Sequence, residues 1–495
     1  MLSKVLRQFS SGHVVCVLAN SQKADRVGTE LMKNLKKLSG GEIKFIGSGG
    51  EGMKGEGLEA FYSTKVFHPK PFVPFRGAVS DEGNLWLWLK INPVTKSYTR
   101  PMHEVLKYIK ENDLVQKIQN YRPGLILTLD HDILSFKIHR QVAQAYKSTS
   151  LIRPKQVHYG RFINRYAPYQ LDYLDHVLYT IPIEPRDWNN FKFPSTYIGQ
   201  SAFEKAYRFL LERNGGDHLL TSNSVKVNRD HFYSETEQYI EAERNTFRKA
   251  HNIPDSATVL FFAPGSNSSE VQWTLPILNK TANKFVDHHV KASNGQKTPD
   301  DFCVVIPTNE STFKHVNDIV KVQGWRCRTI VLEGDEQKRS AQAGSDLAIS
   351  HNGDIVTECL VNQLSTVVIQ NMRKLEFYFV LAWNRFNNDM NIIADGDLFP
   401  EVYEGQCHAD KLLLLLNKWY ESPAHKFWPL QGFESHIHRM LPMKTREMGM
   451  GTHHEYYSPD NLFSNTIWEF LKQVPQRPFA EDQNLFIQNL SPKSA

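Results

Sequence analysis

Two segments of this chain combine a buried strand, a glycine-containing turn and the start of a helix. Residues 261–270 read Phe-Phe-Ala-Pro-Gly-Ser-Asn-Ser-Ser-Glu, and residues 347–358 read Leu-Ala-Ile-Ser-His-Asn-Gly-Asp-Ile-Val-Thr-Glu. A helix that begins after such a turn presents free backbone N–H groups and the positive end of its dipole, which attract a phosphate. The pattern predicts a nucleotide-binding α/β domain. Neither turn contains lysine or arginine, so the positive charge that a diphosphate requires is missing from both.

Predicted strands and helices alternate along most of the chain. Continuous apolar runs such as 13–19 and 124–129 are typical of parallel strands covered on both faces, and helical periodicity follows each of them. A second alternating series begins near residue 240. Such alternation predicts doubly wound sheets, here two Rossmann-like domains that face a cleft.

The breaks in this pattern suggest domain limits. We predict a targeting segment at 1–11, an N-terminal Rossmann-like domain at 12–205 with an inserted hairpin near 67–101, a linker or insertion at 206–240, a C-terminal Rossmann-like domain at 241–420, closing helices at 421–474 and a C-terminal extension at 475–495. Aromatic residues in the hairpin and in the extension favour packing onto the protein or docking on a partner.

Composition excludes several classes of function. The net charge of +5 is spread along the chain without a dense basic block, so we expect no nucleic-acid partner. Apolar runs are too short to cross a bilayer, which favours a soluble or peripheral protein. The five cysteines are scattered without a Cys-x-x-Cys spacing, which indicates buried thiols in a reducing compartment.

The first ten residues have the pattern of a mitochondrial targeting segment. Residues 1–24 contain no acidic side chain, and Leu2, Val5, Leu6 and Phe9 share one helical face. Residues 7–11 resemble a processing site. The alternatives are an incidental basic helical tip or a segment that is retained and docked.

Other catalytic constellations are weak. Three histidine pairs could suggest a metal, but none has an acidic or cysteine partner at a useful spacing in the sequence, so surface or core histidines are expected. The pairs are His288-His289, His436-Ile-His438 and His453-His454. The sequence lacks a P-loop and a Gly-x-Ser-x-Gly elbow, and no acidic residue follows the Gly47 loop at the distance that a nicotinamide site requires.

Several motifs occur in the order in which one known family has them. They are Val14-Val-Cys-Val-Leu-Ala with Asp25, Phe45-Ile-Gly-Ser-Gly-Gly-Glu-Gly-Met-Lys-Gly-Glu-Gly-Leu58, Ala263-Pro-Gly-Ser-Asn-Ser-Ser-Glu270, Gly353 with Glu358, and Asn391 through Glu401. Together they resemble the lipid-A-disaccharide synthases, which are GT-B glycosyltransferases. The resemblance runs from about His13 to about Val474.

The resemblance implies a GT-B fold and transfer of a sugar from UDP-2,3-diacylglucosamine to a second acylated glucosamine phosphate. UDP-sugar and a membrane-associated lipid are the implied ligands, without a metal or other cofactor, and the C-terminal domain is of the nucleotide-sugar type. The implied nucleotide-sugar-binding residues are Asp25, Gly265, Ser266, Asn267, Glu270, Gly353, Glu358, Asn391 and Glu401. If activity is retained, Asp130 and Asp132 are the catalytic carboxylates. Glu358 either holds ribose hydroxyls or is a solvent-facing or capping residue.

The chain departs from the family pattern mainly at polar positions. Asn267 stands where the family has an arginine, which would donate two hydrogen bonds to the diphosphate. In the Asp130 loop the first aspartate remains, but Asp132 stands one residue early, which displaces a base by over ~3 Å. Ser21 and Lys23 occupy two positions of the first turn at which the family has Glu and Ser.

These departures lead to two hypotheses. The first is a catalytically degenerate family member of mitochondria, in the matrix or on the matrix face of the inner membrane, that serves as a structural or accessory subunit of a membrane-associated complex. The second is an active UDP-sugar-dependent glycosyltransferase with a divergent site. Binding of UDP distinguishes the two.

Overall fold

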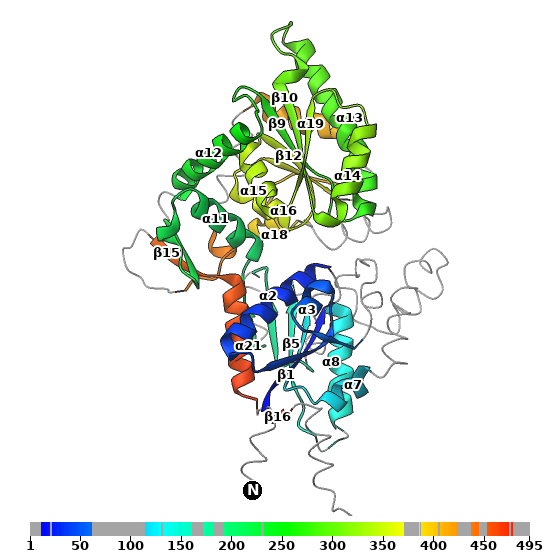
Figure 1. Cartoon of the computed structure of the whole chain (residues 1–495), viewed down its shortest axis with the longest axis vertical. Coiled ribbons are helices and arrows are strands. Elements are labelled where there is room, and N and C mark those ends of the chain that lie inside the picture. Colours follow the sequence, from blue (N-terminus) through cyan, green and yellow to red (C-terminus); the bar gives the residue numbers. More distant parts are fainter. Residues whose placement is uncertain are drawn as a thin grey trace, which may run out of the picture. The chain divides into compact units, whose positions relative to one another are not determined.

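The structure, a computed structural model, describes most of the two predicted domains (Figure 1). The described residues are 11–19, 22–61, 114–129, 132–147, 149, 151–160, 172–182, 193–228, 232–370, 386, 388–403, 406–422, 437–444, 453–474 and 477–478. Residues 1–10 of the predicted targeting segment, the hairpin near 67–101, Asp130 and nearly all of the C-terminal extension lie outside them.

The chain divides into two compact units. Unit 1 comprises Met1–Ile198 and Pro459–Ala495, and unit 2 comprises Gly199–Ser458. Helix α11 (Ser201–Arg213), which spans the predicted limit between the N-terminal domain and the linker at residue 205, packs on helices of unit 2. The segment 206–240, predicted as a linker or insertion, contains most of α11, strand β8 (Ser224–Asn228) and the start of helix α12 (Phe232–Ala250).

Unit 1 contains a parallel sheet built on β1 (Ser11–Ala19). Its strand order is β3 (Glu59–Ala60), β2 (Ile43–Ser48), β1, β4 (Leu125–Leu129), β5 (Lys155–Gly160), β6 (His176–Tyr179) and β7 (Ser195–Tyr197). The short β16 (Arg477–Pro478) pairs antiparallel with the beginning of β1. This order is that of a Rossmann sheet, with the switch point between β1 and β4.

Both faces of the unit 1 sheet are covered, as its unbroken apolar strands predict. Val15 and Val17 face a core formed with α2 (Gln22–Ser39) and α21 (Pro459–Lys472). Val14 and Cys16 point to the opposite core, formed with α7 (Leu114–Tyr121) and α8 (Asp132–Lys147). The last long helix, predicted as part of the closing helices, therefore completes the core of unit 1.

Unit 2 repeats the strand order of unit 1. Its parallel sheet runs β11 (Arg328–Glu333), β10 (Phe302–Thr308), β9 (Thr258–Ala263), β12 (Leu347–His351), β13 (Thr366–Gln370) and β14 (Glu401–Tyr403). The switch point lies between β9 and β12, so the segments 261–270 and 347–358 meet at the carboxyl ends of neighbouring strands. A separate two-stranded sheet pairs β8 with β15 (His453–Tyr457).

Helices cover both faces of the unit 2 sheet (Figure 1). On one face lie α13 (Ser268–Ala292), α14 (Glu310–Val322) and α19 (Ala409–Glu421). On the other lie α12, α15 (Asp335–Gly344) and α16 (Asp354–Val361). The short α18 (Asp389–Ala394) precedes β14. The predicted α/β fold class, with two Rossmann-like doubly wound sheets, is confirmed.

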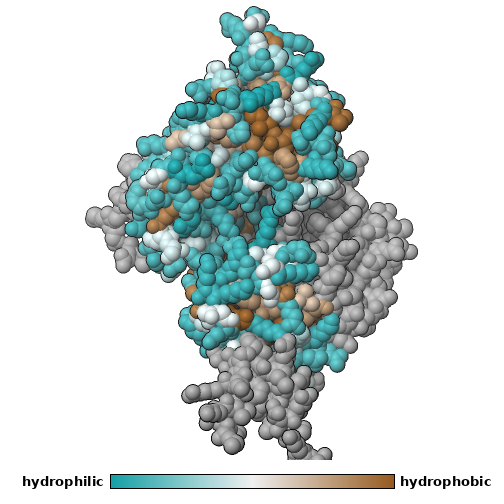
Figure 2. Space-filling view, in the orientation of Figure 1, coloured by the Kyte–Doolittle hydropathy of each residue, from teal (hydrophilic) through white to brown (hydrophobic). Residues whose placement is uncertain are grey.

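The surface of the described residues is mostly hydrophilic on the face shown in Figure 2, with apolar side chains gathered mainly on unit 2. The large apolar side chains that are exposed are Leu38, Ile152, Val322, Leu414 and Met443. Scattered residues of this kind are ordinary on a folded protein. No helix within the described ranges is long and apolar enough to span a membrane. All five cysteines are buried and unpaired, as predicted.

Candidate functional site

The turn after β9 is closed by a carboxylate of the chain itself. Glu270 Oε2 accepts hydrogen bonds from Ser266 N–H (2.7 Å) and Ser266 Oγ–H (3.3 Å). Asn267 caps α13, because its Oδ1 accepts from Glu270 N–H at 3.0 Å. The Glu270 carboxylate therefore accepts a hydrogen bond from a backbone N–H group of the kind that a phosphate binds at a helix start.

Gly265 lets Glu270 approach the turn this closely. Its φ of +128° lies in the region that favours glycine, and a Cβ added there would lie 2.6 Å from Glu270 Oε2. Next to it, Asn309 Nδ2 donates to the carbonyl oxygen of Ser266 at 3.0 Å. Asn309 also caps α14, so the turns after β9 and β10 are joined by a side chain that the family motifs do not include.

The turn after β12 is joined to the segment 388–401 by a chain of amide and carboxylate side chains. Asn388 Nδ2 donates to Asn352 Oδ1 at 2.8 Å, immediately before Gly353. Glu401 Oε1 accepts from Asn388 N–H (3.0 Å) and from Asn391 Nδ2 (2.8 Å). The structure thus brings together three of the predicted site residues, Gly353, Asn391 and Glu401.

Asn391 is fully buried, and the structure gives each of its polar side-chain atoms a partner. Its Nδ2 donates to the Phe399 carbonyl at 2.8 Å as well as to Glu401, and its Oδ1 accepts from Phe399 N–H at 2.9 Å. Tyr403 donates its hydroxyl proton to Glu401 Oε2 at 2.5 Å. In the described structure, Asn391 and Glu401 therefore hold the loop between α18 and β14 in place.

Glu358 forms ion pairs inside the protein. It is 4 % exposed, and its oxygens lie 3.0 Å from Lys338 Nζ and 3.6 Å from Arg339 Nη2. Burial alone would lower the pKa of Lys338, but attraction by Glu358 and Asp335 outweighs it and raises that pKa. Two cations face two carboxylates, so the cluster is close to neutral. Glu358 is thus neither a solvent-facing nor a capping residue.

Asp25 lies in unit 1, where it fills the glycine loop after β2. Its carboxylate accepts from the N–H groups of Gly50 (2.5 Å), Gly52 (3.2 Å) and Met53 (3.3 Å) at the start of α3 (Glu51–Gly55). A Cβ at Gly50 would lie 2.4 Å from Asp25 Oδ2. The glycine-rich sequence that resembles a dinucleotide fingerprint therefore surrounds a side-chain carboxylate.

Of the two predicted catalytic residues, one lies within the described structure. Asp130 is outside the described residues, and Asp132 is the first residue of α8. In β4, Thr128 Oγ1 lies 2.9 Å from His139 Nε2 and 2.8 Å from His158 Nδ1. His139 Nδ1 lies 2.9 Å from Gln156 Oε1. This cluster is fully buried, and sequence reasoning did not find it.

The cluster predicts acid sensitivity of unit 1. Burial lowers the pKa of His139 to about 3, despite the opposing hydrogen bond to Gln156. In the unfolded chain the pKa of His139 has its usual value near 6.5, so as the pH falls the unfolded chain binds the proton before the folded protein does. The contribution of His139 to the free energy of unfolding is complete above pH 6.5. Below that pH it decreases by about 1.4 kcal/mol per pH unit, so the loss at pH 5 is about 2 kcal/mol.

This effect is measured as the free energy of unfolding of unit 1 in denaturant at pH 7 and pH 5. His176, whose pKa burial lowers to about 4, adds to the total loss in the same direction. A His139→Gln variant isolates the contribution of His139, and its stability should fall less over this range. Equal losses in the variant and the wild type would contradict the assignment.

Comparisons with known proteins bear on the family. Residues 231–422, all within unit 2, match the model of the lipid-A-disaccharide synthetase (LpxB) family. The lipid-A-disaccharide synthase of Rhodospirillum centenum is 22% identical over 421 residues, covering 85% of this chain and 88% of that protein. The chain is homologous to the lipid-A-disaccharide synthases. The resemblance predicted from the motifs is therefore confirmed.

One relative of this family is described as mitochondrial. The probable lipid-A-disaccharide synthase, mitochondrial, of Arabidopsis thaliana is 21% identical over 477 residues, covering 93% of this chain and 91% of that protein.

Among solved structures, the UDP-GlcNAc 2-epimerase of Neisseria meningitidis bound to UDP-GlcNAc aligns over 92% of this chain and all of that one, with a TM-score of 0.47 and 11% identity.

Sequence reasoning missed the internal partners of the family residues. Lys338 and Arg339 stand on α15, before the β12 motif, and no spacing links them to Glu358. Asn309 and Asn388 each follow a break in the apolar pattern and cap a helix. An asparagine at such a position is a recognisable capping signal, but its second contact depends on the fold.

Proposed function

We propose that this chain is a mitochondrial lipid-A-disaccharide-synthase-like protein that keeps the family's scaffold without transferring sugar. It acts as a structural or accessory subunit of an assembly at the matrix face of the inner membrane. The observation that carries the proposal is the turn at 264–270, where Glu270 occupies the Ser266 N–H group and Asn267 stands in place of arginine.

The ion pairs of Glu358 support the same proposal. A glutamate that accepts two hydrogen bonds from ribose must present its carboxylate to the ligand. Here the carboxylate lies between Lys338 and Arg339, and releasing it would leave buried cations without their partner. The missing arginine at residue 267 alone would cost about 10²–10³ in rate at a diphosphate leaving group.

The mitochondrial part of the proposal has two supports. The first ten residues have the composition of a targeting segment, and the Arabidopsis relative is described as mitochondrial. The role as a subunit rests on the altered polar positions together with the aromatic residues of the C-terminal extension.

An active UDP-sugar-dependent transferase is the second candidate, and one observation favours it. Lys338 and Arg339 lie in the first turns of α15, which begins directly after β11 at the carboxyl end of the sheet. If Glu358 turned to a ribose, these two cations would be available to a diphosphate. The two candidates therefore differ in whether Glu358 leaves its ion pairs.

Release of UDP tests the proposal directly. The purified full chain is incubated with UDP-2,3-diacylglucosamine and an acylated glucosamine phosphate, and we expect no UDP above the background without protein. Native electrophoresis of mitochondrial membranes is expected to show the chain in a large complex at fixed stoichiometry. Turnover that Glu358→Ala abolishes, in a chain that migrates alone, would refute the proposal.

A further inference from the structure

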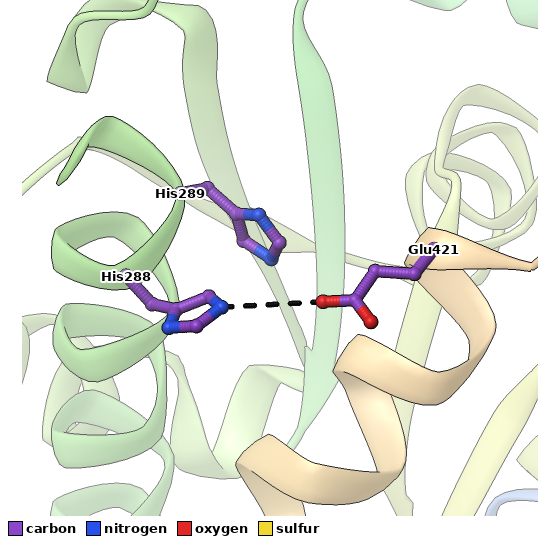
Figure 3. Close-up of side chains that lie close together, drawn as sticks. All are labelled: His288, His289 and Glu421. Carbon is purple, nitrogen blue, oxygen red and sulfur yellow. Dashed lines mark ion pairs between the residues drawn. The ribbon is translucent and has the colours of Figure 1, made fainter. Parts of the chain in front are cut away.

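Three possible metal ligands converge where the end of α13 packs against the end of α19 (Figure 3). His288 and His289 come from α13, and Glu421 is the last residue of α19. His288 Nε2 lies 3.9 Å from Glu421 Oε1. One ligand atom from each of the three residues lies within 4.8 Å of the others. The sequence predicted no acidic partner for this histidine pair, because Glu421 is distant along the chain.

His289 is the fixed member of the group. It is 7 % exposed, and its ring centroid lies 4.4 Å from those of Phe285 and Tyr420. Its Nε2 lies 3.1 Å from Oδ1 of Asn417, one helical turn before Glu421 on α19.

We propose that His288, His289 and Glu421 bind one divalent transition-metal ion of the zinc class. Two imidazole nitrogens and one carboxylate oxygen are a ligand set that zinc accepts, with water as the fourth ligand. Imidazole disfavours Mg²⁺ and Ca²⁺, which prefer oxygen ligands. Asn417 Oδ1 serves as the polar partner that orients the buried imidazole in the metal-free protein.

The side chains need only small movements to close around an ion. Ligand atoms in a tetrahedral zinc site lie about 3.3 Å apart, given metal–ligand distances of about 2.0–2.1 Å. The side chains of His288 and Glu421 are 48 % and 60 % exposed, so both can rotate toward the fixed His289. The ends of α13 and α19 already pack together, and the ion would join them at this point.

The position of the site makes its role structural. Twenty residues of α13 separate Ser268, at the carboxyl end of the sheet, from His288, which corresponds to about 30 Å of helix. The metal would therefore stabilise the far end of unit 2 and take no part in binding a sugar nucleotide. The inference is independent of the proposed function.

Titration of the chelator-treated full chain with Zn²⁺, against a chromophoric competitor, tests the proposal. We expect one tight equivalent that raises the Tm of unit 2, and Co²⁺ should give the visible absorption of a tetrahedral site. His288→Ala and Glu421→Gln change exposed side chains, so the fold should survive, and each should weaken Zn²⁺ binding by roughly 100-fold or more. His218→Ala, at an exposed histidine elsewhere in unit 2, is the matched control and should bind as the wild type does.

Two results would overturn the proposal. Zn²⁺ affinity that is unchanged in both His288→Ala and Glu421→Gln would place the ion elsewhere. Weak uptake of several ions without the Co²⁺ spectrum or a rise in Tm would indicate adventitious binding only. UDP titrations should be the same with and without Zn²⁺, which separates this test from that of the proposed function.

Discussion

Replacing Arg248 with methionine is expected to lower the free energy of unfolding of unit 2 by about 3–5 kcal/mol. The side chain is 1 % exposed, and its guanidinium donates to the carbonyl oxygens of Gly344, Pro254, Asp255 and Ala257. It also pairs with Asp346 at 2.9 Å. Methionine fills much of the volume but donates no hydrogen bond, so these buried acceptors lose a partner.

Arg244→Met is the matched control for Arg248→Met. Arg244 also pairs with Asp346, at 2.6 Å, but its side chain is 23 % exposed and water can replace part of the contact. We expect a loss of about 1 kcal/mol or less. Denaturant unfolding of the two variants, followed by a probe in unit 2, makes the comparison. Equal losses would show that burial of Arg248 does not determine the effect.

Replacing Asp25 with alanine is expected to destabilise unit 1 by about 2–3 kcal/mol, because three backbone N–H groups lose a charged acceptor. The glycine loop and the short α3 should become less ordered. Hydrogen exchange at Gly50, Gly52 and Met53 would measure this locally, and thermal unfolding would measure it for the unit.

Asp25→Asn separates capping from ligand binding. Asparagine keeps one acceptor oxygen and should retain about half of the stability that alanine loses. If Asp25 instead serves a nucleotide sugar, both variants would unfold like the wild type and would lose affinity for the ligand. That outcome would contradict the capping role that the structure assigns to Asp25.

The sequence predicted the scaffold well because the scaffold depends on local patterns. Apolar runs such as 13–19 and 258–263 can be buried only in a strand covered on both faces, and glycine marks the turns that follow strands. The order of these elements then leaves few topologies. The switch points and both cores follow from this information.

The site residues were identified by type, but their partners were not predictable. Whether Glu358 faces a ligand or a cation depends on how α15 packs beside α16, and no periodicity records that packing. Glu270 illustrates the opposite case, since an asparagine followed three residues later by glutamate is a local capping signal. The sequence alone could therefore have suggested that this turn contains its own anion.

The most direct test of the central claim is titration of the purified full chain with UDP in a calorimeter. The resemblance implies that the turn at 264–270 and Glu358 hold the nucleotide, but Glu270 accepts from Ser266 N–H and Glu358 pairs with Lys338 and Arg339. We therefore predict no saturable heat up to about 1 mM UDP, which corresponds to a binding free energy weaker than about −4 kcal/mol. Stoichiometric binding at micromolar UDP that Glu358→Ala abolishes would contradict the account.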